Sequence, residues 1–367
     1  MQAAEHRRLH FAVLSVAWLL MQAFVFYRHG IVTGNEAEKY IGQADILLRT
    51  GSVSDPSMWL YSTQIFLIAG AIQFTGSLAP VVIIQLAVSA AAMFALYNTL
   101  RRFASSLAAS IVTLVLILNY PFQSFNTFLY TESLFFNLSI LLACYLFSIR
   151  TLTATLSLPV MGLLLLLCIT RPSGLLLLPG VFLFYVFSFL PGVPAALKWV
   201  LGLAVAATFL FALNSVVGIG GELDFLRPFR EEHIICGLPT THAGESAAPS
   251  TLWSVLNYVV SHPGQFFELA LKRSAAFFGL TRSYFSTSHN IYLLLYFLPA
   301  YGLAIAGIGA WWKHHRGILT YCVSAIFFTW VTVMFTCDDW HNRFLLSVMP
   351  YFYILSLPVV ERLVGKR

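Results

Sequence analysis

The stretch that decides the fold is Phe11–Tyr27, FAVLSVAWLLMQAFVFY, which is followed shortly by Gly34–Tyr40, GNEAEKY. The first segment holds no charged residue and approaches the ~20 residues that a helix needs to cross the hydrocarbon core of a bilayer. The second segment carries two glutamates and a lysine. Because charges are costly inside a membrane, this pair predicts a membrane protein whose polar chemistry lies at the rim of an apolar bundle.

The composition of the whole chain is also typical of a membrane protein. Of its 367 residues, 59% are hydrophobic and 10% are charged, and the mean hydropathy is +0.79. Soluble globular domains carry about 25% charged residues, so that class is excluded. The net charge of +6 comes from basic residues that form no stripe and often flank apolar runs. This distribution argues against nucleic acid as a partner.

Repeated apolar runs predict an all-α, polytopic membrane helix bundle of about ten spans. Arg7 and Arg8 precede the first span, so we expect a cytoplasmic N-terminus. Strict alternation then returns the C-terminus to the cytoplasm. The predicted spans are Phe11–Tyr27, Pro80–Leu100, Ser106–Tyr120, Leu134–Ile149, Leu156–Ile169, Leu175–Leu190, Trp199–Val217, Ile291–Trp312, Ile318–Phe335 and Phe344–Val360.

One segment, Trp59–Phe74, is apolar but short and has two readings. It crosses the membrane, or it lies flat in the interface as an amphipathic helix. Crossing would turn Arg101 and Arg102 outward and reverse the sidedness of every later loop, so we expect it to lie flat. The chain is then a single domain, 1–367, with a first external loop at 28–78. A second external loop at 218–290 is predicted to hold another interfacial helix, Ser261–Leu280.

Polar residues gather at the predicted external ends of the spans. Because these spans belong to one bundle, we expect their outer turns to share a wet cavity. Four groups lie there: Asn35-Glu36 with Tyr40, Tyr130-Thr131-Glu132-Ser133, Thr170-Arg171-Pro172, and Asp338-Asp339-Trp340-His341-Asn342-Arg343.

The order of these motifs resembles the GT-C glycosyltransferases, integral-membrane enzymes that take a sugar from a polyprenyl phosphate. The most similar branch holds the protein O-mannosyltransferases and the lipid A aminoarabinose transferases. The segments that carry the resemblance are Asn35-Glu36 with Tyr40, Thr131-Glu132, Arg171-Pro172, Arg343 with Pro350-Tyr351, and His262-Pro263 followed by Lys272-Arg273. The chain departs from the family at Asn35, where an Asp is common, which leaves Glu36 as the expected base.

The resemblance implies transfer of a sugar from a polyprenyl-phosphate donor to a lipid, glycan or protein acceptor. The reaction would take place among membrane lipids, at the periplasmic face of a bacterial inner membrane. A carboxylate would take the acceptor's proton, and cationic side chains would hold the leaving phosphate. A divalent cation is optional, and no other cofactor is expected. The residues that we assign to this site are Glu36 and Glu132 as catalytic, and Asn35, Tyr40, Asp55, Arg171, His262, Lys272, Arg273, Asp339 and Arg343 as substrate-binding.

Each of these residues also has a structural interpretation. Glu36 can be a solvated loop carboxylate, in which case Glu38 or Asp55 would be the base. Glu132 can be a first-turn carboxylate favoured by the helix dipole. The cations have alternatives as well: Arg171 as a cap of helix carbonyls, Arg343 as a partner of Asp338 or Asp339, and Lys272 and Arg273 as anchors to lipid headgroups.

Two other functions are open at this stage: a transporter or flippase for a lipid-linked saccharide, and a non-catalytic relative acting as a subunit. A transporter places ionisable sites near the middle of the bilayer, whereas the charges of this chain avoid the centres of the predicted spans. The family commonly has an acid at the position of Asn35, and its absence here leaves the non-catalytic subunit as a possible function.

The five cysteines form no metal-binding pattern. Cys144, Cys168 and Cys322 lie in apolar spans, where we expect them to pack as small hydrophobic residues. Cys236 and Cys337 both fall on the external side, where a disulfide is possible, although a sequence does not give the separation that such a bond requires.

Overall fold

The computed structural model describes residues 2–190, 192–217, 227–230, 232–236, 251–279, 281–282, 284–338 and 341–365. These residues are almost entirely helical and contain no β-strand, only the two isolated bridges Val32–Phe128 and Ile235–Asp338. The all-α prediction is confirmed for this part of the chain. Asp339, one of the predicted binding residues, lies outside the described residues.

The first half of the chain forms the elements α1 (Gln2–His29), α2 (Glu36–Thr50), η1 (Pro56–Tyr61), α3 (Ser62–Thr75), α4 (Ala79–Leu100), α5 (Ser106–Ile117), α6 (Tyr120–Ser124), η2 (Phe125–Thr127), α7 (Thr131–Leu146) and α8 (Ala154–Thr170). The second half forms η3 (Pro172–Leu177), α9 (Leu178–Phe189), α10 (Ala195–Val217), α11 (Arg227–Arg230), α12 (Leu252–Ser261), α13 (Pro263–Gly279), α14 (Thr287–His314), α15 (Arg316–Phe335) and α16 (Arg343–Val364).

Seven helices in the described chain are long and apolar enough to cross a membrane. They are α1 from Arg7 onward, α4, η3 with α9, α10, α14, α15 and α16. The pair α5 and α6, bent by 60°, brings the number to eight if it counts as one span. The chain is therefore an integral membrane protein by length and composition of its helices, with fewer clear spans than the ten predicted. The difference lies in α7 and α8, which are apolar but have only 16 and 17 residues.

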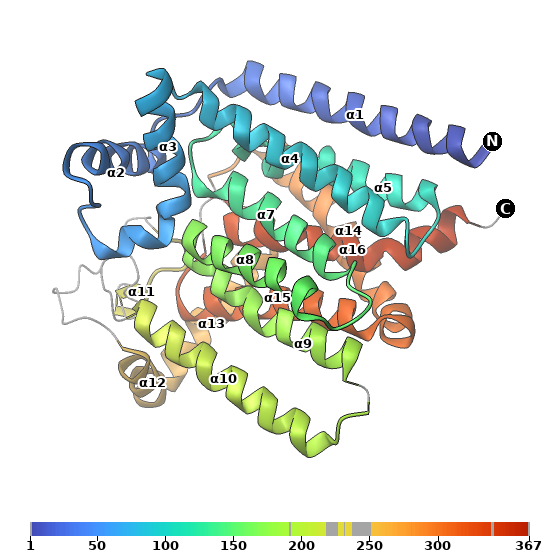
Figure 1. The fold of residues 1–367 in the computed structure, drawn as a ribbon. Coiled ribbons are helices and arrows are strands. Elements are labelled where there is room, and N and C mark those ends of the chain that lie inside the picture. The colour runs from blue at the N-terminus through green and yellow to red at the C-terminus, as the bar shows by residue number, and fades with distance from the viewer. Residues whose placement is uncertain are drawn as a thin grey trace.

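The long helices lie roughly along one common axis, and both chain termini lie at the same end of the bundle (Figure 1). We call this the terminal end. Helices α2, α3, α11 and α12 lie at the opposite end, which we call the loop end (Figure 1). Helix α16 forms the centre of the bundle, where it contacts α5, α7, α13, α14 and α15. Of the residues in its most apolar segment, 78% are buried.

The first predicted external loop, 28–78, contains more structure than we predicted. Instead of one helix it holds two, α2 and α3, which pack against each other. Ala37, Tyr40 and Ala44 are fully buried and lie on one face of α2, because residues three and four apart share a helix face. Gly51 ends α2 with a positive φ of 76°, a conformation that glycine adopts without steric cost. The first residue of α2, Glu36, is thereby held at a fixed position.

The second predicted external loop, 218–290, is described only in part. The expected helix at Ser261–Leu280 is present as α13, which starts at Pro263, and α12 precedes it as a separate helix. A disulfide joins Cys236 to Cys337, with the two Cα atoms 5.4 Å apart, and ties this loop to the end of α15. The possible disulfide is thus present, while Cys144, Cys168 and Cys322 are free.

Candidate functional site

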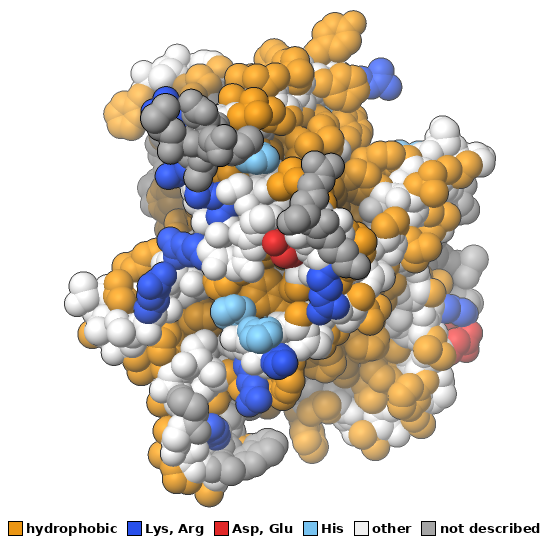
Figure 2. All heavy atoms as spheres, turned by 90° about the vertical axis from the view of Figure 1, so that its right-hand side faces the viewer, with side chains coloured by type: hydrophobic (Ala, Val, Ile, Leu, Met, Phe, Trp, Pro, Cys, Tyr) orange, Lys and Arg blue, Asp and Glu red, His pale blue; other side chains and the backbone are white. Residues whose placement is uncertain are grey.

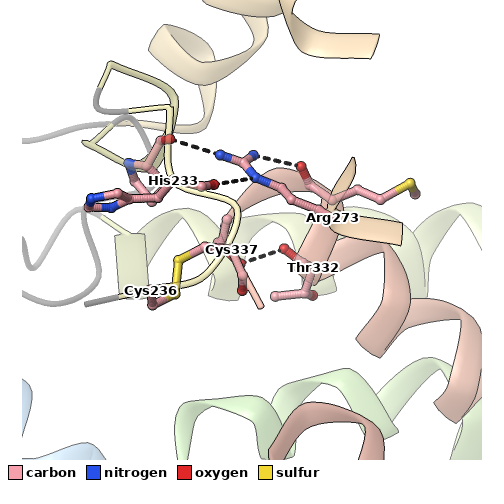
Figure 3. Close-up of a disulfide and its surroundings, with 8 residues drawn as sticks. His233, Cys236, Arg273, Thr332 and Cys337 are labelled. Carbon is pink, nitrogen blue, oxygen red and sulfur yellow. Dashed lines mark hydrogen bonds between the residues drawn. A yellow bond between two sulfur atoms is a disulfide. The ribbon is translucent and has the colours of Figure 1, made fainter. Parts of the chain in front are cut away.

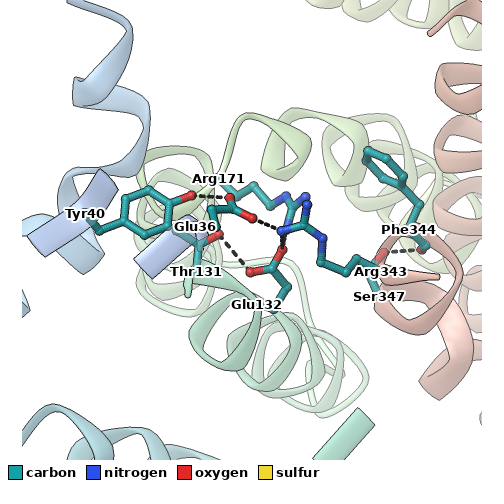
Figure 4. Close-up of polar contacts among 8 residues, drawn as sticks. All are labelled: Glu36, Tyr40, Thr131, Glu132, Arg171, Arg343, Phe344 and Ser347. Atoms are coloured by element: carbon teal, nitrogen blue, oxygen red, sulfur yellow. Dashed lines mark hydrogen bonds and ion pairs between the residues drawn. The ribbon is translucent and has the colours of Figure 1, made fainter. Parts of the chain in front are cut away.

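Two glutamates and two arginines meet at the loop end of the bundle (Figure 4). Arg343 Nη1 contacts Glu36 Oε2 and lies 2.7 Å from Glu132 Oε1. Arg171 Nη1 contacts the same Glu132 oxygen. We call these four residues the charge cluster. Its members come from the first turns of α2, α7 and α16 and from the turn between α8 and η3, so four separate elements converge.

The charge cluster is largely withdrawn from solvent. The side chain of Glu132 is fully buried, those of Arg171 and Arg343 are 13% and 14% exposed, and that of Glu36 is 25% exposed. A buried charge is tolerated only when it is paired, and here two negative groups balance two positive ones. Since Glu36 is the most exposed member, solvent reaches the cluster from the side of α2.

Glu36 is positioned by its own helix and by α7. Asn35, the residue before α2, has a φ of 55°, which Asn adopts more readily than most residues. One helical turn later, the buried Tyr40 donates its hydroxyl to Glu36 Oε1 at 2.7 Å. Tyr130 donates to the carbonyl of Gly34 at 3.3 Å and is also hydrogen-bonded to the side chain of Asn35. These contacts fix the start of α2 against the start of α7.

A network of buried polar side chains holds Ser133, the residue after Glu132 in the first turn of α7. Ser133 donates to Asn126 Oδ1 at 2.8 Å, and Asn126 Nδ2 donates to Gln123 Oε1 at 2.9 Å. Gln22 of α1 also donates to Gln123 Oε1, at 2.8 Å. Polar groups in a membrane bundle must find their partners within the protein. The network therefore pins the first turn of α7, and Glu132 with it, to α1 and α6.

The two arginines occupy helix ends of opposite polarity. Arg171 follows α8 in an extended conformation, as expected for a residue before proline, and a cation is favoured at a helix C-terminus. Arg343 is the first residue of α16, where the helix dipole disfavours a positive charge. Its two carboxylate partners, Glu36 and Glu132, offset that cost. Arg171 also lies over the ring of Phe344, 5.6 Å from its centroid.

The electrostatics of the cluster keep Glu36 ionised. Burial alone raises the pKa of Glu36, but the positive charges of Arg343 and Arg171 and the hydrogen bond from Tyr40 outweigh it, so the pKa lies below the ordinary value of a glutamate. Burial and then the charge of Glu36 raise the pKa of Tyr40 well above its ordinary value. Tyr40 therefore stays protonated and remains a hydrogen-bond donor to the carboxylate.

The structure places three other predicted binding residues away from the cluster contacts. Asp55 is exposed and caps η1, accepting a hydrogen bond from the Ser57 amide at 2.7 Å. His262 ends α12 and stacks on Tyr258, with the ring centroids 4.7 Å apart. Lys272 is exposed and pairs with Glu268, 2.6 Å away on the same face of α13.

Arg273 corrects the prediction of a phosphate-binding pair on α13. Its side chain is fully buried and donates to the carbonyls of His233, Met334 and Pro228 at 2.8, 3.0 and 2.8 Å (Figure 3). The guanidinium also lies 4.5 Å from the centroid of the Phe229 ring. Arg273 thus joins the disulfide-linked loop to α15 and is not available to a lipid phosphate, because it faces the protein rather than the surface.

A second buried ion pair was missed from the sequence. Arg282 Nη2 contacts Asp338 Oδ2, and the two side chains are 3% and 1% exposed. Arg282 Nη1 also donates to the carbonyl of Ala276 at 2.8 Å. Asp338, one of the two acids expected as alternative partners of Arg343, contacts Arg282, and Arg343 contacts Glu36 and Glu132. Nothing in the sequence indicates which acid an isolated arginine will find.

Among the residues that the structure describes, no group of three or more His, Cys, Asp or Glu side chains could hold a metal ion. Comparisons with protein-family models, with curated proteins and with solved structures each found no match. Any assignment of function therefore depends on the charge cluster and on the order of the motifs that form it.

Proposed function

We propose that the chain is a GT-C-like glycosyltransferase that moves a sugar from a polyprenyl-phosphate donor to an acceptor hydroxyl at the loop end of the bundle. The observation that carries this proposal is the charge cluster. The motif order singled out Glu36, Glu132, Arg171 and Arg343 from distant parts of the sequence, and these four side chains make direct contact.

The proposal includes a topology. Counting the bent pair α5 and α6, and the short helices α7 and α8, with the seven long helices gives ten spans. Arg7, Arg8 and Arg362 then lie on the cytoplasmic side, as basic residues near span ends prefer. The loop end faces the periplasm of a bacterial inner membrane, with α2, α3 and α13 at its surface.

The two arginines are suited to a donor phosphate. A guanidinium carries five N–H donors in a planar fork that matches phosphate oxygens. In the structure, Nη1 of each arginine contacts a carboxylate. A phosphate at this position would compete with Glu36 for Arg343 while Glu132, fully buried, keeps both arginines in place. We therefore assign Arg171 and Arg343 to the leaving phosphate and Glu132 to their positioning.

Glu36 is the group that we assign as base. The arginines hold its pKa below the ordinary value, and a base of low pKa removes a hydroxyl proton poorly. The negative charge of a bound phosphate would offset Arg343 and Arg171 and so raise the pKa of Glu36. In the reaction, Glu36 takes the acceptor's proton as the acceptor oxygen bonds to the anomeric carbon. The bond from that carbon to the phosphate oxygen breaks, and its electron pair leaves with the polyprenyl phosphate.

The bundle also offers space for a lipid chain. A groove of about 660 Å³ between α1 and α5 is lined by apolar residues only, among them Val16, Leu20, Phe24 and Leu118. An apolar lining of this kind suits a hydrocarbon tail, which gains nothing from polar contacts. We assign no further role to the groove.

The test of the proposal is the variant Glu36→Gln, which keeps the shape of the side chain and removes the base. Wild type and variant are reconstituted in proteoliposomes with a panel of polyprenyl-phosphate monosaccharides, and release of polyprenyl phosphate is followed. We expect release with at least one donor by wild type and its loss in the variant, with donor binding retained. Glu38→Gln, an exposed neighbour on α2, is the matched control and should keep activity.

The same experiment distinguishes the alternative functions. A transporter would move the intact donor across the bilayer without releasing polyprenyl phosphate, and a non-catalytic subunit would do neither. Donor release by Glu36→Gln at the wild-type rate would show that Glu36 is not the base.

A further inference from the structure

A basic pocket lies at the terminal end of the bundle, opposite the charge cluster. Its volume is about 490 Å³, and it opens between the ends of α4, α7, α9 and α14 and the start of α15. Five cationic or titratable side chains line it, Arg102, Arg150, His314, His315 and Arg316. No carboxylate is among its described lining residues. Figure 2 looks onto this end and shows Lys, Arg and His side chains spread over it.

The arginines of this pocket are not neutralised by the protein. The side chains of Arg102 and Arg150 are exposed and make no hydrogen bond or ion pair with any described residue. Glu361, the acidic side chain that the structure describes at this end, accepts hydrogen bonds from the amide and hydroxyl of Ser105 at 2.8 and 2.6 Å. Two positive charges from different loops therefore converge without a negative partner, in contrast to the paired charge cluster.

The remaining features of the pocket suit an amphipathic ligand. The first turn of α15, from Arg316 to Ile318, lines the pocket, and the free amides of a helix N-terminus favour an anion. Arg316 is held by its Nε, which donates to the carbonyl of Trp312 at 3.2 Å. The aromatic rings of Phe147 and Phe184, 5.9 Å apart, form an apolar part of the wall. Charge at the mouth and apolar surface within is the pattern of a lipid headgroup site between membrane helices.

We propose that this pocket binds the phosphate-bearing headgroup of an anionic phospholipid in the leaflet at the terminal end. Arg102 and Arg150 clasp the phosphate from two sides, since guanidinium forks match phosphate oxygens. The upper part of an acyl chain lies against the phenylalanine wall. The site is independent of sugar transfer, because the pocket lies at the terminal end of the bundle and the charge cluster lies at the loop end.

The test is lipid retention by the full chain, measured by native mass spectrometry after detergent purification with added phosphatidylglycerol or phosphatidylcholine. The variant Arg102→Gln/Arg150→Gln removes the two unpaired charges. The control Arg7→Gln/Arg362→Gln removes two exposed charges from the same end without touching the pocket. We expect phosphatidylglycerol binding to weaken at least about tenfold in the first variant, from loss of charge-assisted hydrogen bonds, and to be unchanged in the control.

Two further arms make the result decisive. Ser188→Glu places a carboxylate at an exposed position of the lining and keeps both arginines, so it should abolish phosphatidylglycerol retention even if the double variant folds poorly. Inorganic phosphate is added as a competitor. Failure to displace the lipid supports the lipid assignment, whereas full displacement would assign the pocket to a free phosphate compound and overturn it. Equal losses in the variant and in the Arg7→Gln/Arg362→Gln control would show diffuse surface attraction and no site.

Discussion

Arg343 Nη1 lies 2.7 Å from Glu132 Oε1, although the two residues are 211 positions apart in the sequence. This contact joins the centre of the bundle, α16, to the start of α7. Glu132 is fully buried and the side chain of Arg343 is 14% exposed. If one partner were removed, water could not adequately solvate the charge of the other. The ion pair therefore links α16 to α7, and it also positions the guanidinium of Arg343 at the loop end.

Removing Glu132 should destabilise the protein strongly. The variant Glu132→Ala leaves Arg171 and Arg343 buried without their shared partner, and breaking a buried ion pair costs about 3–5 kcal/mol. Thermal unfolding in detergent measures the loss. Glu38→Ala removes an exposed glutamate from the same end of the bundle and should leave the unfolding temperature nearly unchanged. Equal unfolding temperatures for the two variants would contradict the buried pairing.

The contribution of Glu36 to stability should depend on pH in one direction. Because the folded-state pKa lies below the ordinary value of a glutamate, ionised Glu36 stabilises the fold at pH values above that ordinary value. This stability is lost as the pH falls through the folded-state value, where the carboxylate is protonated. The difference in unfolding temperature between wild type and Glu36→Gln should therefore shrink on acidification from about pH 6. A difference that grows with acid would contradict the assigned ion pair.

Arg273 and Lys272 should behave oppositely although they are neighbours. Arg273→Gln leaves buried carbonyls of three segments without donors, and each lost partner of a buried group costs about 1–3 kcal/mol. Lys272→Gln removes only an exposed pair with Glu268 and should have no measurable effect. Unfolding temperature and release of polyprenyl phosphate, normalised to folded protein, are the two readouts. If Lys272→Gln lost donor binding at unchanged stability, Lys272 would have to be assigned to the donor-binding site.

The contact of α14 with α16 should depend on a single glycine. A Cβ at Gly307 would collide with the carbonyl oxygen of Leu355, whereas a Cβ at Gly309 would meet no atom within 4 Å. Gly307→Ala therefore pushes α14 away from the central helix and should cost about 1–3 kcal/mol. Gly309→Ala, at an exposed position on the other side of α14, should be neutral or slightly stabilising because alanine favours a helix. The free energies of unfolding of the two variants check this directly.

The sequence was informative where a single chemical pattern decides the outcome. Long apolar runs predicted the helices, and the placement of Glu36, Glu132, Arg171 and Arg343 at span ends of one predicted side indicated that they would lie together. The contacts of the four side chains agree with that expectation. The pattern was weaker for α7 and α8, since apolar content does not tell a short span from a helix buried inside the bundle.

Other features depend on packing that one sequence does not encode locally. Arg273 lies on an amphipathic helix, and nothing in its spacing shows whether that face meets water, lipid or the disulfide-linked loop. The pairing of Arg282 with Asp338 depends on how the second predicted external loop packs against α15. Helix α2 was overlooked because its charged residues suggested a solvated loop, whereas Ala37, Tyr40 and Ala44 bury one face of it.

The most direct test of the central claim is a structure of the chain with polyprenyl phosphate bound. The claim is that Arg343 and Arg171 exchange part of their carboxylate contacts for the phosphate and leave Glu36 facing the position of the anomeric carbon. We predict density for the phosphate within hydrogen-bond distance of both guanidiniums, with Glu132 still beneath them. A phosphate bound elsewhere in the bundle, with all contacts of the charge cluster unchanged, would contradict the account.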